Sequence, residues 1–326
     1  MCAISNTFCI LYIYLPTPDK EETDSPVKPK PQFAIITAKE TVQNVVKRYL
    51  KLGDYGRVCE QLSAYEWEKD PFLQKKEVKI IANDSVGIYD MFTIGEVMGV
   101  HVNCTRIGPG GAQATTSDLL RKASEEKWPL KAIFVVGCCG VSMSDAKKMQ
   151  KNWRGTVLLS DQMEDYLDAG KAIKTGLQPK PRTYNLCGIW VNWLSEESIS
   201  QPDVREDSQR DIPMERVDKY LSGPLVIKSE EDGNDYPGNC QMAGIEMEGA
   251  RVYSIVDRSP LKDTTYVAVV KGISDYADTD KNKLAKSMVF GKETGGEIDE
   301  KTRQEIATFN AITLVTRCVA RNAKRL

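Results

Sequence analysis

Apolar residues first gather into regular segments at residue 33. Phe33–Ile36 is a short apolar run that predicts a buried strand, and Val42–Leu50 repeats apolar residues at helical spacing. A βα unit of this kind places its turn, here Thr37-Ala38, at the sheet edge where ligands bind. The preceding residues 17–32 combine prolines and charges with almost no apolar side chain, which is typical of a linker.

Segments typical of strands come next, and strands and helices alternate after them. Tyr89–Gly95 and Val97–Asn103 predict a hairpin or meander. A glycine-rich turn then opens a predicted helix over Ala112–Ala123, and Ala132–Val136 and Gly155–Asp161 have the apolar character of strands. This alternation predicts an α/β fold, a three-layer αβα sandwich with a mixed central β-sheet.

The pattern is least regular over residues 163–236, which are rich in proline, polar residues and acidic turns. Long irregular segments in a compact domain are usually lids or insertions, so we expect an insertion beside the functional site, with disordered pieces as the alternative. An amphipathic helix from Asp299 to Ala323 is predicted to end the chain. The expected organisation is an N-terminal tail and linker over 1–32, followed by one domain over 33–326.

Composition excludes several classes of function. The 326 residues include 44 Lys and Arg against 46 Asp and Glu, so there is no basic footprint for nucleic acid. No apolar stretch reaches the roughly 18 residues of a membrane span. The nine cysteines lack a disulfide or zinc-site spacing and indicate a reducing compartment, so we expect a cytoplasmic protein. The single histidine, His101, argues against a Ser-His-Asp hydrolase and is expected to be a packed or surface side chain.

Two motifs near the C-terminal end carry the candidate chemistry. The first is Glu246-Met247-Glu248, and the second is Ser274-Asp275 within Val269–Asp278. Both place carboxylates at the ends of apolar segments. A ribosyl bond breaks through a cationic, oxocarbenium-like sugar, so its cleavage benefits from groups that hold the sugar hydroxyls and protonate the departing base. Two carboxylates in different environments can divide those tasks.

These motifs resemble those of the purine nucleoside phosphorylase and methylthioadenosine/S-adenosylhomocysteine nucleosidase superfamily, over the whole predicted domain. The resemblance implies that Glu248 holds the ribose hydroxyls, Met247 lies against the sugar face, and Asp275 donates a proton to N7 of a purine. Glu246 and Ser274 are expected in the same substrate site. The alternative for the first motif is that its two acidic residues merely begin a helix, at the positive end of the helix dipole.

The glycine-rich turn before the predicted helix is the candidate for the anion or water side of the site. Such a turn presents backbone N–H groups, and Arg106 adds a planar set of donors, so Arg106, Gly108 and Gly110 are the expected contacts. Phosphorylases of the superfamily have a serine hydroxyl where this chain has Pro109. A tight turn with a surface arginine is the alternative interpretation.

The first βα turn also departs from the resemblance. Nucleosidases of the superfamily use a Glu there to activate water, whereas this chain has Val42, and Glu40 is out of phase. The arginine that phosphorylases use at this turn is also missing. Beyond the second motif, Thr279–Lys283 continues the similarity to a branch that contains hydrolases.

The sequence therefore predicts an enzyme that cleaves the N-glycosidic bond of a purine nucleoside or nucleotide, with hydrolysis slightly favoured. Phosphorolysis, with inorganic phosphate as co-substrate, stays open. So does a catalytically reduced module that binds or senses a nucleoside. The motifs call for no metal and no organic cofactor, and the resemblance implies a homo-oligomer.

Overall fold

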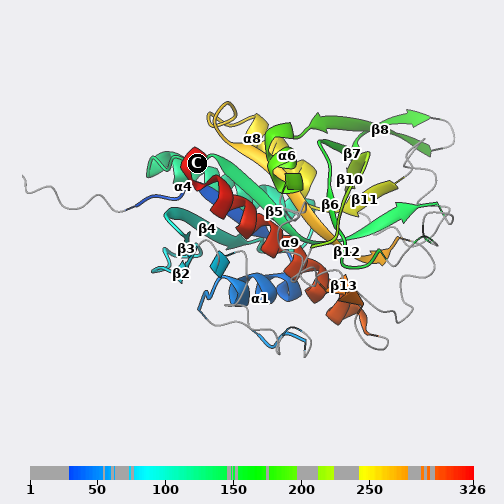
Figure 1. Cartoon of the computed structure of the whole chain (residues 1–326). Helices are drawn as coiled ribbons and strands as arrows, with labels where there is room; N and C mark the ends of the chain where they lie inside the picture. Colours follow the sequence, from blue (N-terminus) through cyan, green and yellow to red (C-terminus); the bar gives the residue numbers. More distant parts are fainter. Residues whose placement is uncertain are drawn as a thin grey trace, which may run out of the picture.

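The computed structural model of the protein has helices on both faces of one large mixed sheet (Figure 1). The residues that the structure describes are 29–53, 56–59, 62, 73–74, 77–144, 148, 150, 153–173, 176–196, 212–223, 242–277, 288–289, 292–293 and 298–326. Their arrangement confirms the predicted α/β class and the αβα sandwich. Within these ranges no helix has the length and apolar character needed to cross a membrane.

Strand β5 (Ala132–Met143) organises the sheet. β12 (Tyr266–Tyr276) runs parallel along one edge of β5 for most of its length. On the other edge, β1 (Phe33–Thr37) pairs in parallel with the first residues of β5, and β11 (Met242–Glu246) pairs antiparallel with the last ones. Among the described strands, none pairs with residues 136–139 on that edge. The sheet is therefore interrupted beside the middle of β5.

The other strands extend the sheet in both directions. Three of them, in order outward from β1, are β4 (Val97–Asn103), β3 (Asp90–Ile94) and β2 (Ile80–Ala82). Outward from β11 lie β10 (Lys219–Ser222), β7 (Gln162–Ile173) and β8 (Gly176–Asn185). β6 (Val157–Leu159) pairs with β12, and β9 (Met214–Arg216) pairs with β6. A separate hairpin joins β13 (Met288–Val289) and β14 (Lys292–Glu293). The predicted hairpin of β3 and β4 is confirmed.

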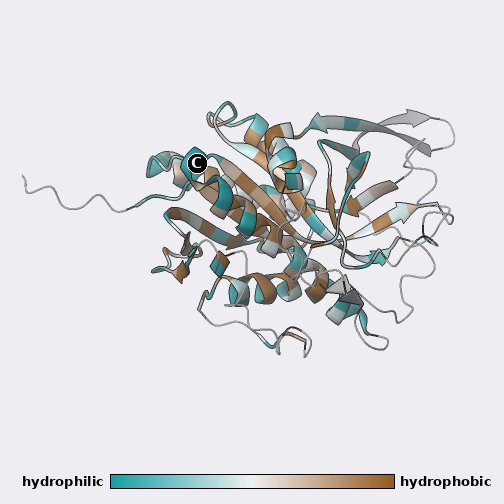
Figure 2. Cartoon of the chain, viewed as in Figure 1, coloured by the Kyte–Doolittle hydropathy of each residue, from teal (hydrophilic) through white to brown (hydrophobic). Residues whose placement is uncertain are grey.

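Two helical layers enclose the sheet. One face carries α1 (Glu40–Tyr49), α6 (Gly188–Glu196) and α9 (Glu300–Asn322). The opposite face carries α4 (Pro109–Glu125) and α8 (Gly249–Asp257), which pack against each other. A short 3₁₀ turn, η4 (Ala323–Arg325), follows α9. Each layer buries its own apolar cluster against the sheet, and Figure 2 shows hydrophobic residues concentrated in the central strands and the helices around them.

The segment 163–236 is more regular than expected. Its described residues form most of the β7–β8 hairpin, helix α6 and the short strands β9 and β10, and β10 lies inside the main sheet. The prolines at 179 and 181 suggested a loop, but they lie in β8, at the end of the strand order. An edge strand tolerates proline because one side of it needs no N–H donors. Residues 197–211 and 224–241 are outside the described residues, and so are residues 1–28 of the tail and linker predicted over 1–32.

The predicted C-terminal helix is confirmed, but it is buried nearly all round rather than along one apolar face. Most of the 23 residues of α9 are buried, because α9 packs on β12, β5, α1 and α6. Three of its buried threonines are satisfied within the helix: the hydroxyls of Thr308, Thr313 and Thr316 each donate to a carbonyl four residues earlier. Such local bonds let polar residues enter a core without an unpaired group. The side chain of Asp299 caps the helix by accepting the Thr302 N–H at 2.7 Å.

Candidate active site

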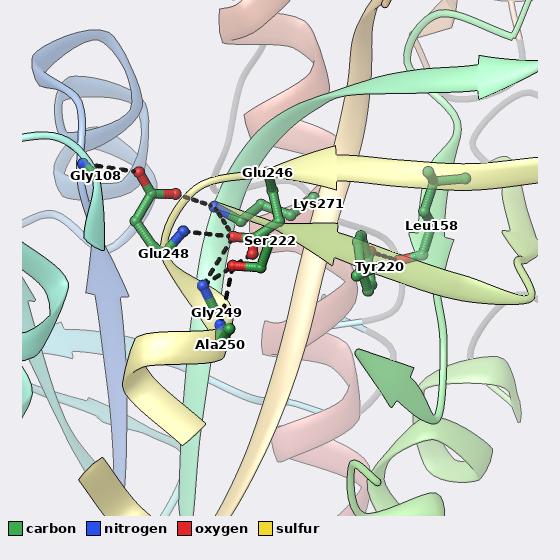
Figure 3. A network of polar contacts seen from close by, with 9 residues as sticks. All are labelled: Gly108, Leu158, Tyr220, Ser222, Glu246, Glu248, Gly249, Ala250 and Lys271. Atoms are coloured by element: carbon green, nitrogen blue, oxygen red, sulfur yellow. Dashed lines mark hydrogen bonds and ion pairs between the residues drawn. The ribbon is translucent and has the colours of Figure 1, made fainter. Parts of the chain in front are cut away.

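The two predicted motifs meet at the interruption in the sheet, beside the middle of β5. Glu246 is the last residue of β11, and Met247 and Glu248 form the short turn into α8. The second motif is on β12, where Lys271 pairs with Gly137 of β5. β1 and β11 approach from opposite directions along the same edge of β5, and both end beside residues 136–139, with which no described strand pairs on that edge. The turn at Gly108, which precedes α4, reaches the same place (Figure 3).

Glu248 is a buried carboxylate held from two sides. Its Oε2 lies 3.1 Å from Nζ of Lys271, and its Oε1 accepts the Gly108 N–H at 3.3 Å. Glu248 is 6 % exposed and Lys271 is 3 % exposed. A charge can be buried at moderate cost only when it is paired, and these two charges are paired with each other. The contact also joins β12, the α8 turn and the α4 turn.

Glu246 has a different task, because its carboxylate caps α8. It accepts the backbone N–H groups of Glu248 and Gly249, each at 3.0 Å. Burial raises the pKa of the Glu246 carboxyl, and the neighbouring Glu248 raises it further, whereas Lys271 at 3.6 Å lowers it. The helix-start interpretation therefore applies to Glu246. The Glu248 side chain makes no capping bond to α8.

Lys271 is the residue of this site that the sequence analysis missed. Burial alone would lower the pKa of its ammonium group, but Glu248 and Glu246 raise it above the usual value for a lysine, so the group is charged. The available signal was a lysine within the otherwise apolar run that leads to the second motif. Lysine is almost never fully buried without a partner, so such a lysine predicts a nearby carboxylate.

Asp275 lies at an irregularity of β12. The pairing of β12 with β5 shifts register between Ile273 and Asp275, so that Ser274 is an extra residue in the strand. The Ser274 hydroxyl is 2.7 Å from Oδ2 of Asp275 and 3.2 Å from the Cys139 carbonyl oxygen. A Cβ atom added at Gly140 would lie 3.3 Å from Oδ1 of Asp275, so glycine leaves room beside this carboxyl group. Asp275 is 4 % exposed.

Cys138 lies near both Lys271 and Asp275. Burial raises the pKa of its thiol, Lys271 and Lys39 lower it, and Asp275 raises it. The thiol is therefore within electrostatic reach of both the Lys271 ammonium and the Asp275 carboxyl. Cys138 and Cys139 of β5 pair with the stretch of β12 that lies between these two groups.

The glycine-rich turn contributes a backbone N–H group to the site, whereas the side chain of its Arg106 is exposed. Gly108 has a φ of +91°, which favours glycine, and a Cβ atom there would lie 3.6 Å from Cε of Met247. Gly108 thus bonds to Glu248, and the end of the Met247 side chain lies nearby. Arg106 is exposed and lies beside Gly110, where an added Cβ atom would be 2.7 Å from its Nη2. Pro109 occupies the first position of α4, where its missing N–H costs nothing.

The first βα turn brings an aliphatic group to the site. Val42 is buried, and its Cγ1 would be 3.4 Å from a Cβ atom added at Gly137, while Nζ of Lys271 would be 3.6 Å from the same atom. Glu40 is exposed in the first turn of α1. The carboxylates that the structure does bring here are those of Glu246, Glu248 and Asp275.

His101 belongs to a separate buried network. Its Nε2 is 3.0 Å from Oγ1 of Thr37, and its Nδ1 is 3.2 Å from Oδ2 of Asp90, which also pairs with Lys47 at 3.2 Å. Burial lowers the pKa of His101, against the opposing effect of Asp90. Of the two placements expected for His101, packed or on the surface, the structure shows the packed one. Throughout the described part of the chain, no group of three or more His, Cys, Asp or Glu is arranged to hold a metal ion.

Solved structures with the same fold include nucleosidases and a futalosine hydrolase. The methylthioadenosine/S-adenosylhomocysteine nucleosidase of Neisseria meningitidis, in complex with methylthio-immucillin-A, is 16 % identical with a TM-score of 0.53, and the match covers 89 % of this chain and 98 % of that one. The futalosine hydrolase of Helicobacter pylori is 14 % identical with a TM-score of 0.54, covering 89 % and 98 %. The S-adenosylhomocysteine nucleosidase of Streptococcus pyogenes, in complex with 5-methylthiotubericidin, is 14 % identical with a TM-score of 0.54, covering 91 % and 98 %.

These likenesses show that the chain has the same fold as these two nucleosidases and this hydrolase, which agrees with the fold expected from the two motifs. No protein-family model matches the sequence, and no curated protein matches it.

Proposed function

We propose that this protein cleaves the N-glycosidic bond of a purine nucleoside or nucleotide, by hydrolysis rather than phosphorolysis. The observation that carries the proposal is that the Glu248–Lys271 pair, the Gly108 turn and Asp275 beside the β12 bulge gather around residues 137–140 of β5. The fold supports it, because two nucleosidases and a futalosine hydrolase are among the solved structures that share it.

Glu248 is the proposed ribose-binding residue. An ionised carboxylate offers about four lone-pair positions, and Lys271 and Gly108 occupy two of them. The remaining positions can accept the sugar hydroxyls. Met247, which lies against Gly108, is proposed to contact the sugar face, and Glu246 supports the pair by fixing the start of α8.

Asp275 is the proposed general acid. When the bond from the sugar to the base breaks, the electron pair stays with the base, and a proton from Asp275 to N7 neutralises the developing charge. The Ser274 hydroxyl, 2.7 Å from Oδ2, orients the carboxyl group. General acid catalysis of this kind contributes about 10²–10⁴-fold to a rate.

The α4 turn favours water over phosphate as the nucleophile. The Gly108 N–H is directed at a protein carboxylate, Pro109 supplies no hydroxyl, and Arg106 is exposed. An anion would meet few donors here besides the guanidinium. Arg106, Gly108 and Gly110 are therefore proposed to border the water side of the site.

Val42 is the observation that favours the alternative, a module that binds a nucleoside without cleaving it. No carboxylate from α1 stands at that position to activate water, and an aliphatic side chain is buried there instead. Such a module would keep Glu248 and Met247 as binding groups. It would be stabilised by a nucleoside that it does not consume.

A panel of purine nucleosides and nucleotides, incubated with and without phosphate, tests these assignments. Hydrolysis predicts free base together with free ribose or its 5′-phosphate, at a rate independent of phosphate. Ribose 1-phosphate, formed at a rate that saturates with phosphate, would establish phosphorolysis instead. A rise in melting temperature without any free base would establish the binding module.

The proposal also covers the cell compartment, the oligomeric state and the cofactor requirement. The six described cysteines are all free thiols, which agrees with a reducing compartment, and we propose a cytoplasmic enzyme. The superfamily resemblance leads us to propose a homo-oligomer that needs no metal or organic cofactor. Light scattering of the purified chain and activity after treatment with a chelator test both points.

A further inference from the structure

We infer that Arg303 of α9 is a positioning residue for the general acid, acting through the bulge at Ser274. The inference rests on the proposed function. Arg303 is 1 % exposed, although arginine is rarely buried unless its donors are used. Its Nε donates to the Ser274 carbonyl oxygen at 3.2 Å, and its Nη1 donates to the Ile298 carbonyl oxygen at 2.9 Å.

The bulge explains why Ser274 needs this donor. Because the register shifts between Ile273 and Asp275, Ser274 has no residue opposite it on β5. On the other edge of β12, β6 pairs only as far as Gly272, and Ile273 bonds to the loop before β6 through Gly155 and Thr156. Regular pairing on β5 resumes with Asp275. The Arg303 guanidinium thus supplies the ladder bond that a neighbouring strand would give to Ser274.

A bulge matters here because it determines where the next side chain points. An extra residue in one strand bends it and redirects the side chains that follow. The Ser274 hydroxyl bonds to Asp275, so the backbone that Arg303 holds also carries the group that orients the carboxyl. A planar guanidinium with two donors in use fixes this backbone more firmly than an ammonium ion on a flexible chain.

α9 gives Arg303 a rigid base. Arg303 is in the first turns of a 23-residue helix whose start is capped by Asp299, and the helix packs directly on β12. A Cβ atom at Gly272 would lie 2.2 Å from the Ala307 carbonyl oxygen, so the two elements are in backbone contact one turn further along. The position of Arg303 relative to the bulge is therefore set by the packing of helix on strand.

Arg303→Lys tests the inference, since it keeps the charge and loses the planar pair of donors. We expect kcat for a purine nucleoside to fall by about 10²-fold, the cost of a misplacement near 1 Å, with KM changed less than about threefold. The matched control is Arg317→Lys, the same substitution at a buried arginine of α9 about 20 Å further along the helix. That variant should keep the parent kcat, whatever its melting temperature.

The leaving group separates positioning of the acid from a merely structural role. A purine nucleoside methylated at N7 departs as a neutral base without receiving a proton. The Arg303→Lys defect should therefore shrink to a few-fold on that substrate, whereas a general disturbance of the fold would lower both rates equally. In the double variant with Ser274→Ala, the losses in kcat should be less than additive, because both changes misplace the same carboxyl group.

The outcomes are distinguishable. A parent protein that releases no base from any nucleoside overturns the proposed function. If the parent is active and its activity depends on Asp275, two results would overturn the role of Arg303 alone. One is Arg303→Lys kinetics like those of Arg317→Lys, and the other is an equal loss of rate on both substrates. If Arg303→Lys is too unstable for kinetics, Arg303→Gln keeps amide donors at this position, and the ratio of its losses on the two substrates decides in the same way.

Discussion

Glu246 and Glu248 are two positions apart, yet their carboxylates serve different partners. The residue at the end of β11 accepts backbone N–H groups of α8, while the residue in the turn faces Lys271 and Gly108. The difference follows from the strand-to-turn transition, because alternation of side chains holds only within a strand. One motif therefore supplies both a helix cap and a ligand for the site.

At Asp275 the expected consequence of substitution is chemical. Asp275→Asn keeps the size of the side chain but removes the acidic proton, so kcat should fall by about 10²–10⁴-fold. The melting temperature should stay within a few degrees, because an amide can still accept the Ser274 hydroxyl bond of 2.7 Å. Steady-state rates of base release, beside thermal unfolding, check this. Equal rates for the variant and the parent would remove Asp275 from the mechanism.

Glu248 is expected to act on the sugar. Glu248→Gln should weaken binding of the riboside, and a 2′- or 3′-deoxyriboside should lose less from this change if the missing hydroxyl was the partner. Comparing kcat/KM for two enzymes and two substrates gives the coupling between them. Strictly additive losses would mean that Glu248 is structural, held only by its contacts with Lys271 and Gly108.

Lys271 should contribute mainly to stability. Lys271→Met leaves two buried carboxylates without their cation, at a cost of about 3–5 kcal/mol in the free energy of unfolding. The pKa of the Glu246 carboxyl, which burial already raises, would rise further without Lys271, so the variant should regain stability as the pH falls from 7 toward 5. Denaturant unfolding at several pH values measures both effects.

Lys219→Met is the matched control for this change. Lys219 pairs with Glu164 at 2.5 Å, but both side chains keep some exposure, so the loss should be about 1 kcal/mol or less. A similar loss in the free energy of unfolding for both variants would show that burying the ion pair of Lys271 adds nothing to its contribution to stability.

Among the elements, β12 and α9 depend most closely on each other. Gly272 permits their contact, since a Cβ atom there would be 2.2 Å from the Ala307 carbonyl oxygen. Gly272→Ala should therefore lower the free energy of unfolding by about 1–3 kcal/mol or more, as overpacking does. Gly188→Ala, at the start of α6 with nothing within 4 Å of the added methyl group, should be nearly neutral in the same denaturant titration. Equal stability of the two variants would show that β12 and α9 separate without cost.

The sequence predicted elements well where local pattern and environment agree. β1, the β3–β4 hairpin and α4 follow from apolar periodicity and glycine turns. β8 was missed because its prolines are typical of loops, and only its place at the edge of the sheet makes them acceptable. The burial of α9 was missed because its threonines satisfy their hydroxyls locally, which no periodicity reveals.

Within the candidate site, short motifs identified side chains but not their partners. Glu248 and Asp275 are recognisable from neighbours along the chain. Lys271 and Arg303 are important through contacts with residues 23 and 29 positions away, and these contacts exist only once β12, α8 and α9 have packed. Such pairs depend on tertiary structure, so one sequence cannot identify them from spacing alone.

At the scale of the whole molecule, His101 joins β1, β3, β4 and α1 and should make stability depend on pH. The groups that face it are Thr37, Asp90 and, through Asp90, Lys47. Since burial lowers the pKa of His101 below its usual value of 6.5, the unfolded chain binds a proton more readily as the pH falls through that value. The penalty between pH 7 and pH 5 is at most about 2 kcal/mol for one such group.

The free energy of unfolding should therefore decrease from pH 7 to pH 5, and His101→Gln should show a shallower decrease over the same range. Asp90 does not interfere: burial raises its pKa, but the contacts with His101 and Lys47 outweigh burial and lower the pKa to about 2, so the stability that Asp90 contributes is lost only at a more acidic pH. The amide of Gln can still donate to Asp90 and meet Thr37, so the variant keeps the network while removing the titration. Parallel stability profiles for the parent and His101→Gln would show that His101 takes up its proton equally well in both states, in conflict with its complete burial.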